Sequence, residues 1–284
     1  MIRISRTAAL LFALAAVSAC GGGFQARKFS TNPLLFDAGL KELNKKKWDN
    51  AVIAFERLTL DLTARDTLLP PSQLYLGKAH EGRGEFLLAA QSYARLAETY
   101  PDDSLAAVGL LAAGNAYLKL WRSPALDPTY GTLAQTQFRL LSSLYPDSKL
   151  RAEADKGVAH VDELMATKDY ETAQHYVRRK AFDSSIIYFK DVVRNYPNTN
   201  ISRDAMMRMV EVYRRPEMNY KDEAKEMCTA LTGAYPTDGE VAALCPSDGS
   251  VPDPSKKKAA PVKKPAVEMP AKLPAKVPAV KPAA

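Results

Sequence analysis

The chain has 284 residues, of which 46% are hydrophobic and 25% are charged, and its formal net charge is +7. Most of the positive excess lies at one end, because residues 251–284 contain eight lysines and two acids, whereas Cys20–Ser250 contains 29 basic and 30 acidic residues. A body this close to neutral argues against a nucleic-acid partner, since binding to phosphates requires a basic surface.

Residues 1–19 are predicted to be a secretory signal peptide. Arg3 and Arg6 precede an uncharged apolar run, Ala8–Val17, and small residues follow it, as in secretory signals. A run this short cannot cross a bilayer core, which requires roughly 20 residues. We therefore expect the segment to be removed rather than retained as a membrane anchor.

Cys20 determines the expected location. The segment Val17-Ser18-Ala19-Cys20 resembles the bacterial lipobox, which implies that Cys20 becomes the first residue and carries acyl chains. Two or more chains anchor a protein stably to a membrane. Gly21 stands where an aspartate would favour inner-membrane retention, which implies sorting to the outer membrane. Residues 20–32 are then expected to be the lipidated cysteine and a flexible linker; the alternative is an ordinary secretory signal with an incidental Cys20.

Residues 33–245 have helical apolar spacing and almost no strand signal, which predicts an all-α body. Four Tyr-Pro pairs recur along this body. Eight positions before each proline stands a residue of the large position of the repeat, and four positions before that stands a small residue. The prolines are Pro101, Pro146, Pro197 and Pro236; the residues eight before are Tyr93, Phe138, Phe189 and Cys228; the small residues are Ala89, Ala134, Ser185 and Ala224. Ala51 and Phe55 repeat the spacing without a proline, so five units are expected.

Another small residue, twelve positions before the first, extends the pattern. Gly39, Gly77 and Ala173 satisfy it directly, Gly114 after an eight-residue insertion around 122–129, and Val210 after a two-residue insertion near 216–218. This spacing resembles the 34-residue tetratricopeptide repeat, in which each unit is a pair of packed helices.

The pattern therefore predicts five tetratricopeptide-like helix-turn-helix units that stack into a superhelix. Their expected bounds are 33–70, 71–103, 104–148, 149–199 and 200–245. The fourth unit begins with a long helical stretch, 149–165, before its own first helix from Asp169. Small residues let paired helices approach closely, the large residue is expected to fill the gap to the next unit, and the proline ends the second helix. The alternative is a bundle of unrelated amphipathic hairpins.

The sequence contains no motif that indicates an enzyme. The stretch His80-Glu81-Gly82-Arg83-Gly84 begins like a metalloprotease motif, but glycine stands where the second zinc ligand is required. Neither a nucleophile elbow nor a phosphate-binding loop occurs. We therefore expect no catalytic residues, no metal site and no cofactor.

Cys228 and Cys245 are the other two cysteines of a chain expected to be exported. Exported proteins meet an oxidising compartment, so one interpretation is a disulfide between them. The other is that Cys228 is buried as a small hydrophobe and Cys245 is exposed.

Residues 246–284 are expected to form a disordered tail rich in Lys, Pro and Ala. Its prolines recur every four or five residues from Pro261 onward, which prevents helix and sheet from propagating. Such an arm can touch anionic cell-wall or lipid surfaces. The alternative is a solubilising extension without a fixed partner.

The lipobox, the five units and the insertion in the third unit together resemble the BamD family of outer-membrane assembly lipoproteins. The sharpest match runs from Ala125 to Ser148, where Asp127-Pro128 precedes the second helix, and continues from Glu163 to Thr199. The resemblance covers residues 20–240 and leaves out the tail. It implies a non-catalytic scaffold at the periplasmic face of the outer membrane, within the β-barrel assembly machinery.

The resemblance also implies partners and their sites. They are the POTRA region of a BamA-like insertase, unfolded outer-membrane β-barrel precursors and other assembly lipoproteins. A precursor is expected in a groove formed by Phe36, Leu40, Leu74, Lys78, Leu111, Asn115 and Lys119. The insertase is expected on the fourth and fifth units, at Tyr170, Arg178, Arg179, Tyr213, Arg214 and Arg215, since aromatic and arginine side chains are enriched in interface hot spots.

For each groove residue taken singly, packing between repeats or plain solvent exposure is the alternative. A competing hypothesis for the whole chain is a tetratricopeptide lipoprotein that organises the envelope in a pilotin-like, cell-wall or division-coordinating role. Such a protein would share the array, but not the insertion in the third unit or the tyrosine-rich fourth unit.

Overall fold

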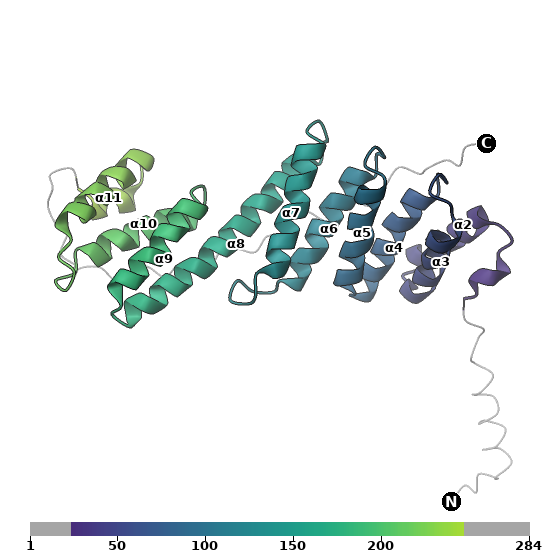
Figure 1. Cartoon of the computed structure of the whole chain (residues 1–284), viewed down its shortest axis with the longest axis horizontal. Helices are drawn as coiled ribbons and strands as arrows, with labels where there is room; N and C mark the ends of the chain where they lie inside the picture. The colour runs from purple at the N-terminus through teal and green to yellow at the C-terminus, as the bar shows by residue number, and fades with distance from the viewer. Residues whose placement is uncertain (1–23, 247–284) are drawn as a thin grey trace, which may run out of the picture. The chain divides into compact units, whose positions relative to one another are not determined.

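The computed structural model describes residues 24–246, and all regular structure in that range is helical (Figure 1). The elements are η1 (Ala26–Lys28), α2 (Asn32–Asn44), α3 (Trp48–Asp61), α4 (Leu69–Arg83), α5 (Phe86–Thr99), α6 (Ala106–Leu120), α7 (Thr129–Leu144), α8 (Arg151–Arg178), α9 (Phe182–Asn195), α10 (Asn200–Tyr213), α11 (Lys221–Ala234) and α12 (Gly239–Leu244). The predicted signal peptide, Cys20 and all but the first residue of the predicted tail lie outside the described residues.

Helices α2 to α11 form five consecutive hairpins; α2 begins at Asn32 and α4 at Leu69, one and two residues before the predicted starts of the first and second units. The all-α prediction is confirmed. The loop at 121–128, between α6 and α7, occupies the position of the predicted eight-residue insertion. The pairing of helices along the chain is that of a tetratricopeptide-like array.

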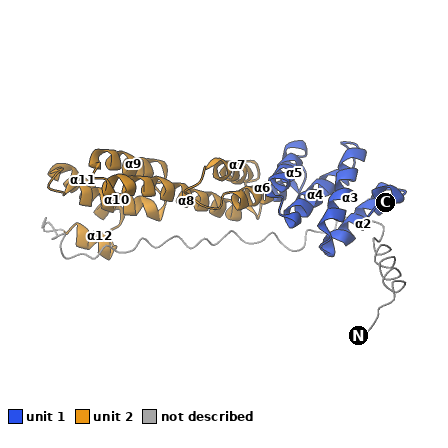
Figure 2. Ribbon diagram, turned by 90° about the horizontal axis from the view of Figure 1, so that it is seen from below, with its two compact units in different colours: residues 1–109, 276–284 blue, residues 110–275 orange. Residues whose placement is uncertain are grey.

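The chain divides into two compact units, with the boundary inside α6 between Gly109 and Leu110 (Figure 2). Unit 1 holds η1 and α2 to α5, and its core is built around Phe36, Phe55 and Leu58. Unit 2 holds α7 to α12. Its main core lies among α8, α9 and α10, and a smaller one lies beneath α12.

The Tyr-Pro pairs end the second helices as the sequence predicts. Helices α5, α7, α9 and α11 stop at C-cap residues Tyr100, Tyr145, Tyr196 and Tyr235, with φ between −126° and −131° and ψ between 52° and 62°. This backbone lies outside the helical region, as expected for a residue that precedes proline. Each tyrosine N–H still bonds to the carbonyl four residues back, which completes the last turn.

The turn inside four of the hairpins repeats a second geometry, which the sequence analysis did not foresee. Lys46, Gly84, Lys180 and Asn219 have φ between 52° and 80°. The next residue in each case caps the second helix with φ near −87° and ψ between 63° and 73°. Only glycine adopts positive φ without cost, so the two lysines hold conformations that the rest of the turn must enforce.

The small residue of each first helix lies against the large residue of its own hairpin. A Cβ placed on Gly77 would lie 2.5 Å from Tyr93 Cε1, and one on Gly114 would lie 2.4 Å from Phe138 Cε1. Tyr93 and Phe138 are fully buried. Each ring therefore covers the glycine of its own unit, and Phe138 also fills the gap to the next unit as expected, because a Cβ on Gly157 of α8 would lie 2.7 Å from it.

Helix α8 also differs from the expectation. Two helices were predicted, 149–165 and another from Asp169, but one helix of 28 residues runs from Arg151 to Arg178. No proline or glycine occurs after Gly157 in this helix, so nothing interrupts its hydrogen bonding. Its first half packs on α7, where a Cβ on Gly157 would lie 2.7 Å from Phe138, and its second half packs on α9 and α10.

Part of the predicted flexible linker, 20–32, is packed on the body of unit 1. From Phe24 onward the chain is ordered: Phe24 and Phe29 stack with ring centroids 5.6 Å apart and pack on the core of unit 1. Two aromatic rings bury enough apolar surface to hold such a segment in place.

The glycine contacts yield a test of what sets the distance between helices. Gly77→Ala is expected to lower the free energy of unfolding by about 1–3 kcal/mol, because the added methyl overlaps the Tyr93 ring. Gly233→Ala is the matched control: it also lies in a helix, nothing lies within 4 Å of its Cβ position, and alanine stabilises by up to about 1 kcal/mol. Urea unfolding followed by circular dichroism measures both; equal effects would contradict the packing argument.

Candidate interaction surfaces

The groove residues predicted in unit 1 divide into buried and accessible side chains. Leu74 is fully buried and Phe36 nearly so, which assigns both to internal packing and corrects their expected role. Leu40 and Lys78 are half-buried. The structure adds Tyr75, which the sequence analysis missed: its ring centroid lies 5.8 Å from that of Phe36, and Lys78 Nζ lies 5.2 Å from the Tyr75 centroid.

The local electrostatics of this unit 1 surface favour a partly dehydrated cation. Burial lowers the pKa of Lys78 below its ordinary value, opposed by the charge of Glu81. The Tyr75 ring offsets part of the cost of burying the Lys78 charge, because an aromatic face attracts a cation. Leu40, Tyr75 and Lys78 thus place apolar surface beside a positive charge.

In unit 2, Leu111 is fully buried, so its predicted role in the groove is also corrected. Asn115 and Lys119, one and two turns later on α6, are half-buried. Asn115 Oδ1 is buried without a hydrogen-bond partner. A buried amide oxygen in that state favours a donor from outside, which keeps Asn115 as a candidate contact.

The residues predicted for the insertase also separate by burial. Tyr170 and Tyr213 are nearly fully buried: the Tyr170 ring packs on Phe189 with centroids 5.4 Å apart, and its hydroxyl accepts a hydrogen bond from Gln174. Both tyrosines belong to the core of unit 2. The structure therefore assigns them to packing and not to a surface.

The four arginines have different surroundings. Arg214 donates to the Leu244 carbonyl at 2.7 Å and to Cys228 Sγ at 3.4 Å, and the Arg215 guanidinium lies 4.9 Å from the centre of the Phe182 ring. Arg178 and Arg179, at the end of α8, are exposed. Of the predicted set, this pair is the most accessible to a partner.

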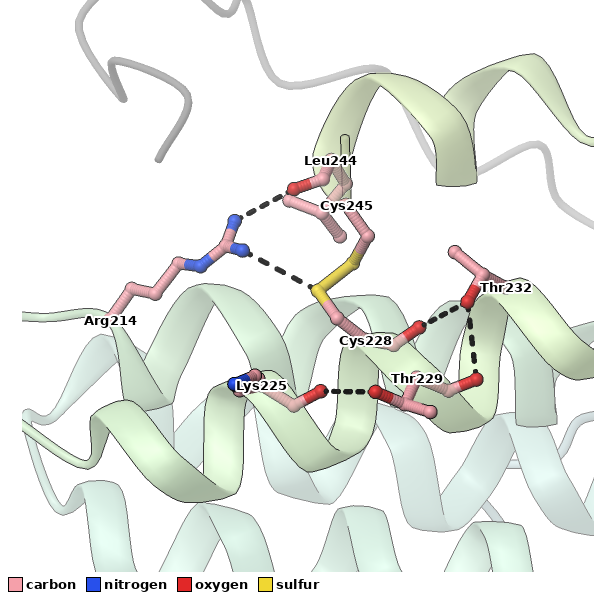
Figure 3. The surroundings of a disulfide bond; sticks show 7 residues. All are labelled: Arg214, Lys225, Cys228, Thr229, Thr232, Leu244 and Cys245. Atoms are coloured by element: carbon pink, nitrogen blue, oxygen red, sulfur yellow. Dashed lines mark hydrogen bonds between the residues drawn. A yellow bond between two sulfur atoms is a disulfide. The ribbon is translucent and has the colours of Figure 1, made fainter. Parts of the chain in front are cut away.

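The disulfide joins Cys228 on α11 to Cys245 at the end of α12, with Cα atoms 5.4 Å apart (Figure 3). This is the first of the two interpretations of these cysteines, a disulfide between Cys228 and Cys245. Arg214 reaches across from the end of α10 to both sides of the bond (Figure 3). The bond fixes α12 on α11, where Val241 and Leu244 pack with Val210 and Leu231.

Arg203 on α10 holds the other end of α12. It donates two hydrogen bonds to Asp238, at 2.6 and 2.9 Å, and one to Glu240 at 2.7 Å. Asp238 also caps α12 by accepting from the N–H groups of Glu240 and Val241. Hydrogen bonding to Arg203, followed by these backbone donors, holds the pKa of Asp238 at about 2.

A cleft of about 580 Å³ lies in unit 2 where the end of α7, the first half of α8 and the turn before α10 meet. Its lining includes Asp155, Asp162, Tyr196 and Pro197. The sequence analysis did not predict this cleft, because the cleft forms only where α8 extends past α7 toward α10. Its position beside an uninterrupted 28-residue helix has no local signature in the sequence.

Within residues 24–246, no group of three or more metal-ligating side chains is gathered, and none of the helices there is long and apolar enough to cross a membrane. His80, in the metalloprotease-like stretch, is buried and pairs with Glu85 at 2.8 Å. Consecutive helical hairpins joined by short turns define a helical-repeat fold of the tetratricopeptide class.

Comparison with known proteins identifies the family. The model of the YfiO family, described as outer membrane lipoprotein, matches residues 30–228, and the chain belongs to this family. Two similar relatives are both named outer membrane protein assembly factor BamD. The one from Rickettsia prowazekii is 24% identical, covering 80% of this chain and 91% of the relative; the one from Caulobacter vibrioides is 23% identical, covering 82% and 76%. The expectations of an outer membrane lipoprotein and of a non-catalytic protein agree with this membership.

Among solved structures, the tetratricopeptide domain of P58(IPK) is similar at 13% identity with a TM-score of 0.41, covering 84% of this chain and 58% of that chain. A thermophilic tetratricopeptide protein of Thermus thermophilus is similar at 17% identity with a TM-score of 0.34, covering 74% and 95%. The five hairpins described above define the fold independently of these likenesses.

The attachment of α12 predicts a pH dependence. The pKa of Asp238 is lower in the folded chain than the ordinary value of about 3.9, so its contribution is present above pH 4 and is lost as the pH falls toward 2. Asp238→Asn keeps a good N-cap but removes the charge, and is expected to destabilise α12 by about 1 kcal/mol at pH 7.

Hydrogen exchange of the α12 amides between pH 7 and pH 2.5, corrected for intrinsic rates, measures this effect. The difference between wild type and Asp238→Asn is expected to shrink as the pH falls. A difference that stayed constant down to pH 2.5 would show that the charge of Asp238 does not hold α12.

Proposed function

We propose that this chain is a non-catalytic assembly factor for outer-membrane β-barrel proteins. The match of the YfiO family model to residues 30–228 is the observation that carries the proposal, and the names of the relatives from Rickettsia prowazekii and Caulobacter vibrioides support it. Cys20 would carry the lipid that holds the chain at the periplasmic face. The envelope-organising alternative has no comparable support.

Unit 1 is proposed to engage unfolded barrel precursors through Leu40, Tyr75 and Lys78. An extended precursor strand alternates apolar and polar side chains. A half-buried tyrosine and leucine accept the apolar ones, while Lys78 attracts carboxylates or backbone carbonyls. Precursor binding at such a small surface is weak and reversible, which suits a protein that must release its substrate. In unit 2, Asn115 and Lys119 remain candidates for the same role.

Unit 2 is proposed to bind the POTRA region of a BamA-like insertase around the end of α8. Arg178 and Arg179 are adjacent exposed cations, and Arg215 stacks on Phe182 close to the same turn. Arginines presented on a rigid scaffold make bidentate contacts with carboxylates. Other assembly lipoproteins are further partners of the family that this proposal accommodates without assigning a site to them.

The insertase site is tested by reversing the exposed charges. Arg178→Glu with Arg179→Glu is expected to reduce copurification of the insertase about tenfold, because like charges replace complementary ones. Lys46→Glu with Lys47→Glu is the matched control, since these exposed lysines occupy the equivalent turn in the first hairpin. Affinity purification from detergent-solubilised membranes, with quantitative blotting, provides the measurement; unchanged copurification would place the insertase elsewhere.

The assembly function itself is tested by depletion. Loss of the chain is expected to lower the amounts of many outer-membrane barrels together, because they share one insertion route. Quantitative proteomics of outer membranes during depletion measures this outcome. A confined defect in shape, pili or division with unchanged barrel levels would instead favour the envelope-organising scaffold.

A further inference from the structure

We propose that the cleft of unit 2 is a docking site for the chain's own Lys/Pro tail, residues 255–284. The cleft is formed by the end of α7, the first half of α8 and the turn 195–199 before α10. The tail lies outside the described residues. The proposal rests on three observations: the charges of the cleft, its apolar surfaces, and the point at which the chain leaves the structure.

The cleft presents carboxylates that are incompletely neutralised. Asp162 lies with 28% of its side chain exposed; its cation, Arg139, also lines the cleft, stands 3.9 Å away and is itself 62% exposed. Gln135 donates to the same carboxylate at 2.5 Å. Partial burial raises the pKa of Asp162 above its ordinary value despite both partners. A further cation would therefore be stabilised there.

A second carboxylate, Asp155, lies on the same face of α8 as Asp162, seven residues or about two turns earlier. It accepts a hydrogen bond from Ser142 at 2.6 Å, and Arg151 approaches it at 3.8 Å from the exposed side. The two acids are spaced by about 10 Å along the helix, at 1.5 Å per residue. Two lysines three or four residues apart in an extended chain bridge that spacing, at about 3.1 Å per residue.

The remaining surface of the cleft suits a proline-rich backbone. Val158 and Ala159 line it from α8, and Tyr196 and Pro197 line it from the turn before α10. Extended proline-rich segments bind grooves lined by aromatic and apolar side chains, because their backbone loses little entropy on binding.

The tail has the complementary composition. Residues 255–284 contain eight lysines and one acid, Glu268, with Pro, Val, Leu and Ala between the lysines. In the segment 272–281, lysines at 272, 276 and 281 recur every four or five residues. The four-residue spacing from Lys272 to Lys276 matches two carboxylates about 10 Å apart at 3.1 Å per residue, with Leu273, Pro274 and Ala275 between them facing apolar surface.

The chain leaves the structure at a point from which the tail can reach the cleft. Thr199, which lines the cleft, caps α10, and four residues later Arg203 bonds to Asp238 at the start of α12. From there α12 adds six residues, or about 9 Å, before the last described residue, Pro246. A tail of 38 residues extends up to about 118 Å at 3.1 Å per residue, so it reaches the cleft without constraint.

The test uses the full mature, lipidated chain in detergent. A photoreactive benzoylphenylalanine replaces Ala159, an exposed residue that lines the cleft, and the matched control replaces Ala230, an exposed residue of α11 outside it. We expect tryptic mapping to find cross-links from position 159 to residues 255–284 with at least about fivefold higher yield than from position 230. The yield is expected to fall in 0.5 M NaCl, because salt screens exposed charges.

Asp155→Asn with Asp162→Asn, introduced together with the probe at 159, is expected to remove most of the cross-linked tail. Asp222→Asn with Glu223→Gln on α11 is the charge control and is expected to leave it unchanged; circular dichroism verifies that every variant is folded. Equal yields from positions 159 and 230, or insensitivity to the Asp155 and Asp162 changes, would overturn the proposal. Mixing isotope-labelled and unlabelled chains distinguishes a neighbour's tail, and cross-links formed only between molecules, or only to another protein, would also overturn it.

Discussion

The distance between the two helices of a hairpin depends on one contact, in which an aromatic ring lies against a glycine. Tyr93 covers Gly77, and Phe138 lies between Gly114 on α6 and Gly157 on α8. Because a single added carbon would come within 2.4 to 2.7 Å of the ring, the glycine determines how closely the two backbones approach. Cores are packed at crystal-like density, so every other contact in the hairpin must adapt to that distance.

Phe138 also explains why α8 is one long helix. The Phe138 ring lies between two glycines, Gly114 and Gly157, so the first part of α8 packs closely on α7. The same helix then continues and packs against α9 and α10. A break between these two tasks would require a proline or a glycine near residue 166, and the chain has neither there. The cleft lies on the first half of α8, whereas the core that α8 shares with α9 and α10 begins at Ala166.

The sequence was sufficient for the five hairpins and their order, because spacing to proline and small-to-large periodicity are local signals, but it divided α8 into two helices and did not predict α12. It was insufficient for the turns: Lys46 and Lys180 adopt positive φ, and nothing about lysine indicates that conformation. It was also insufficient for surfaces. Tyr170 and Tyr213 were selected as aromatic contacts, but amphipathic rings serve cores equally well, and only burial distinguishes the two uses. Tyr75 was missed because its accessibility depends on its neighbours.

The end of the array shows how the same contact is replaced when it is lost. At the position where the four earlier hairpins carry Phe55, Tyr93, Phe138 and Phe189, the fifth carries Cys228, which is too small to cover its first helix. No further hairpin follows among the described residues, so Val210 and Leu231 would face solvent.

The six-residue α12 covers them instead. A helix this short has no stability of its own, so it must be fastened at both ends. The disulfide from Cys228 does this at one end, and Arg203 does it at the other. Cys228, which is too small to cover the first helix of its hairpin, thus forms the disulfide that holds α12 in place. Terminal repeats of such arrays require a capping element of this kind.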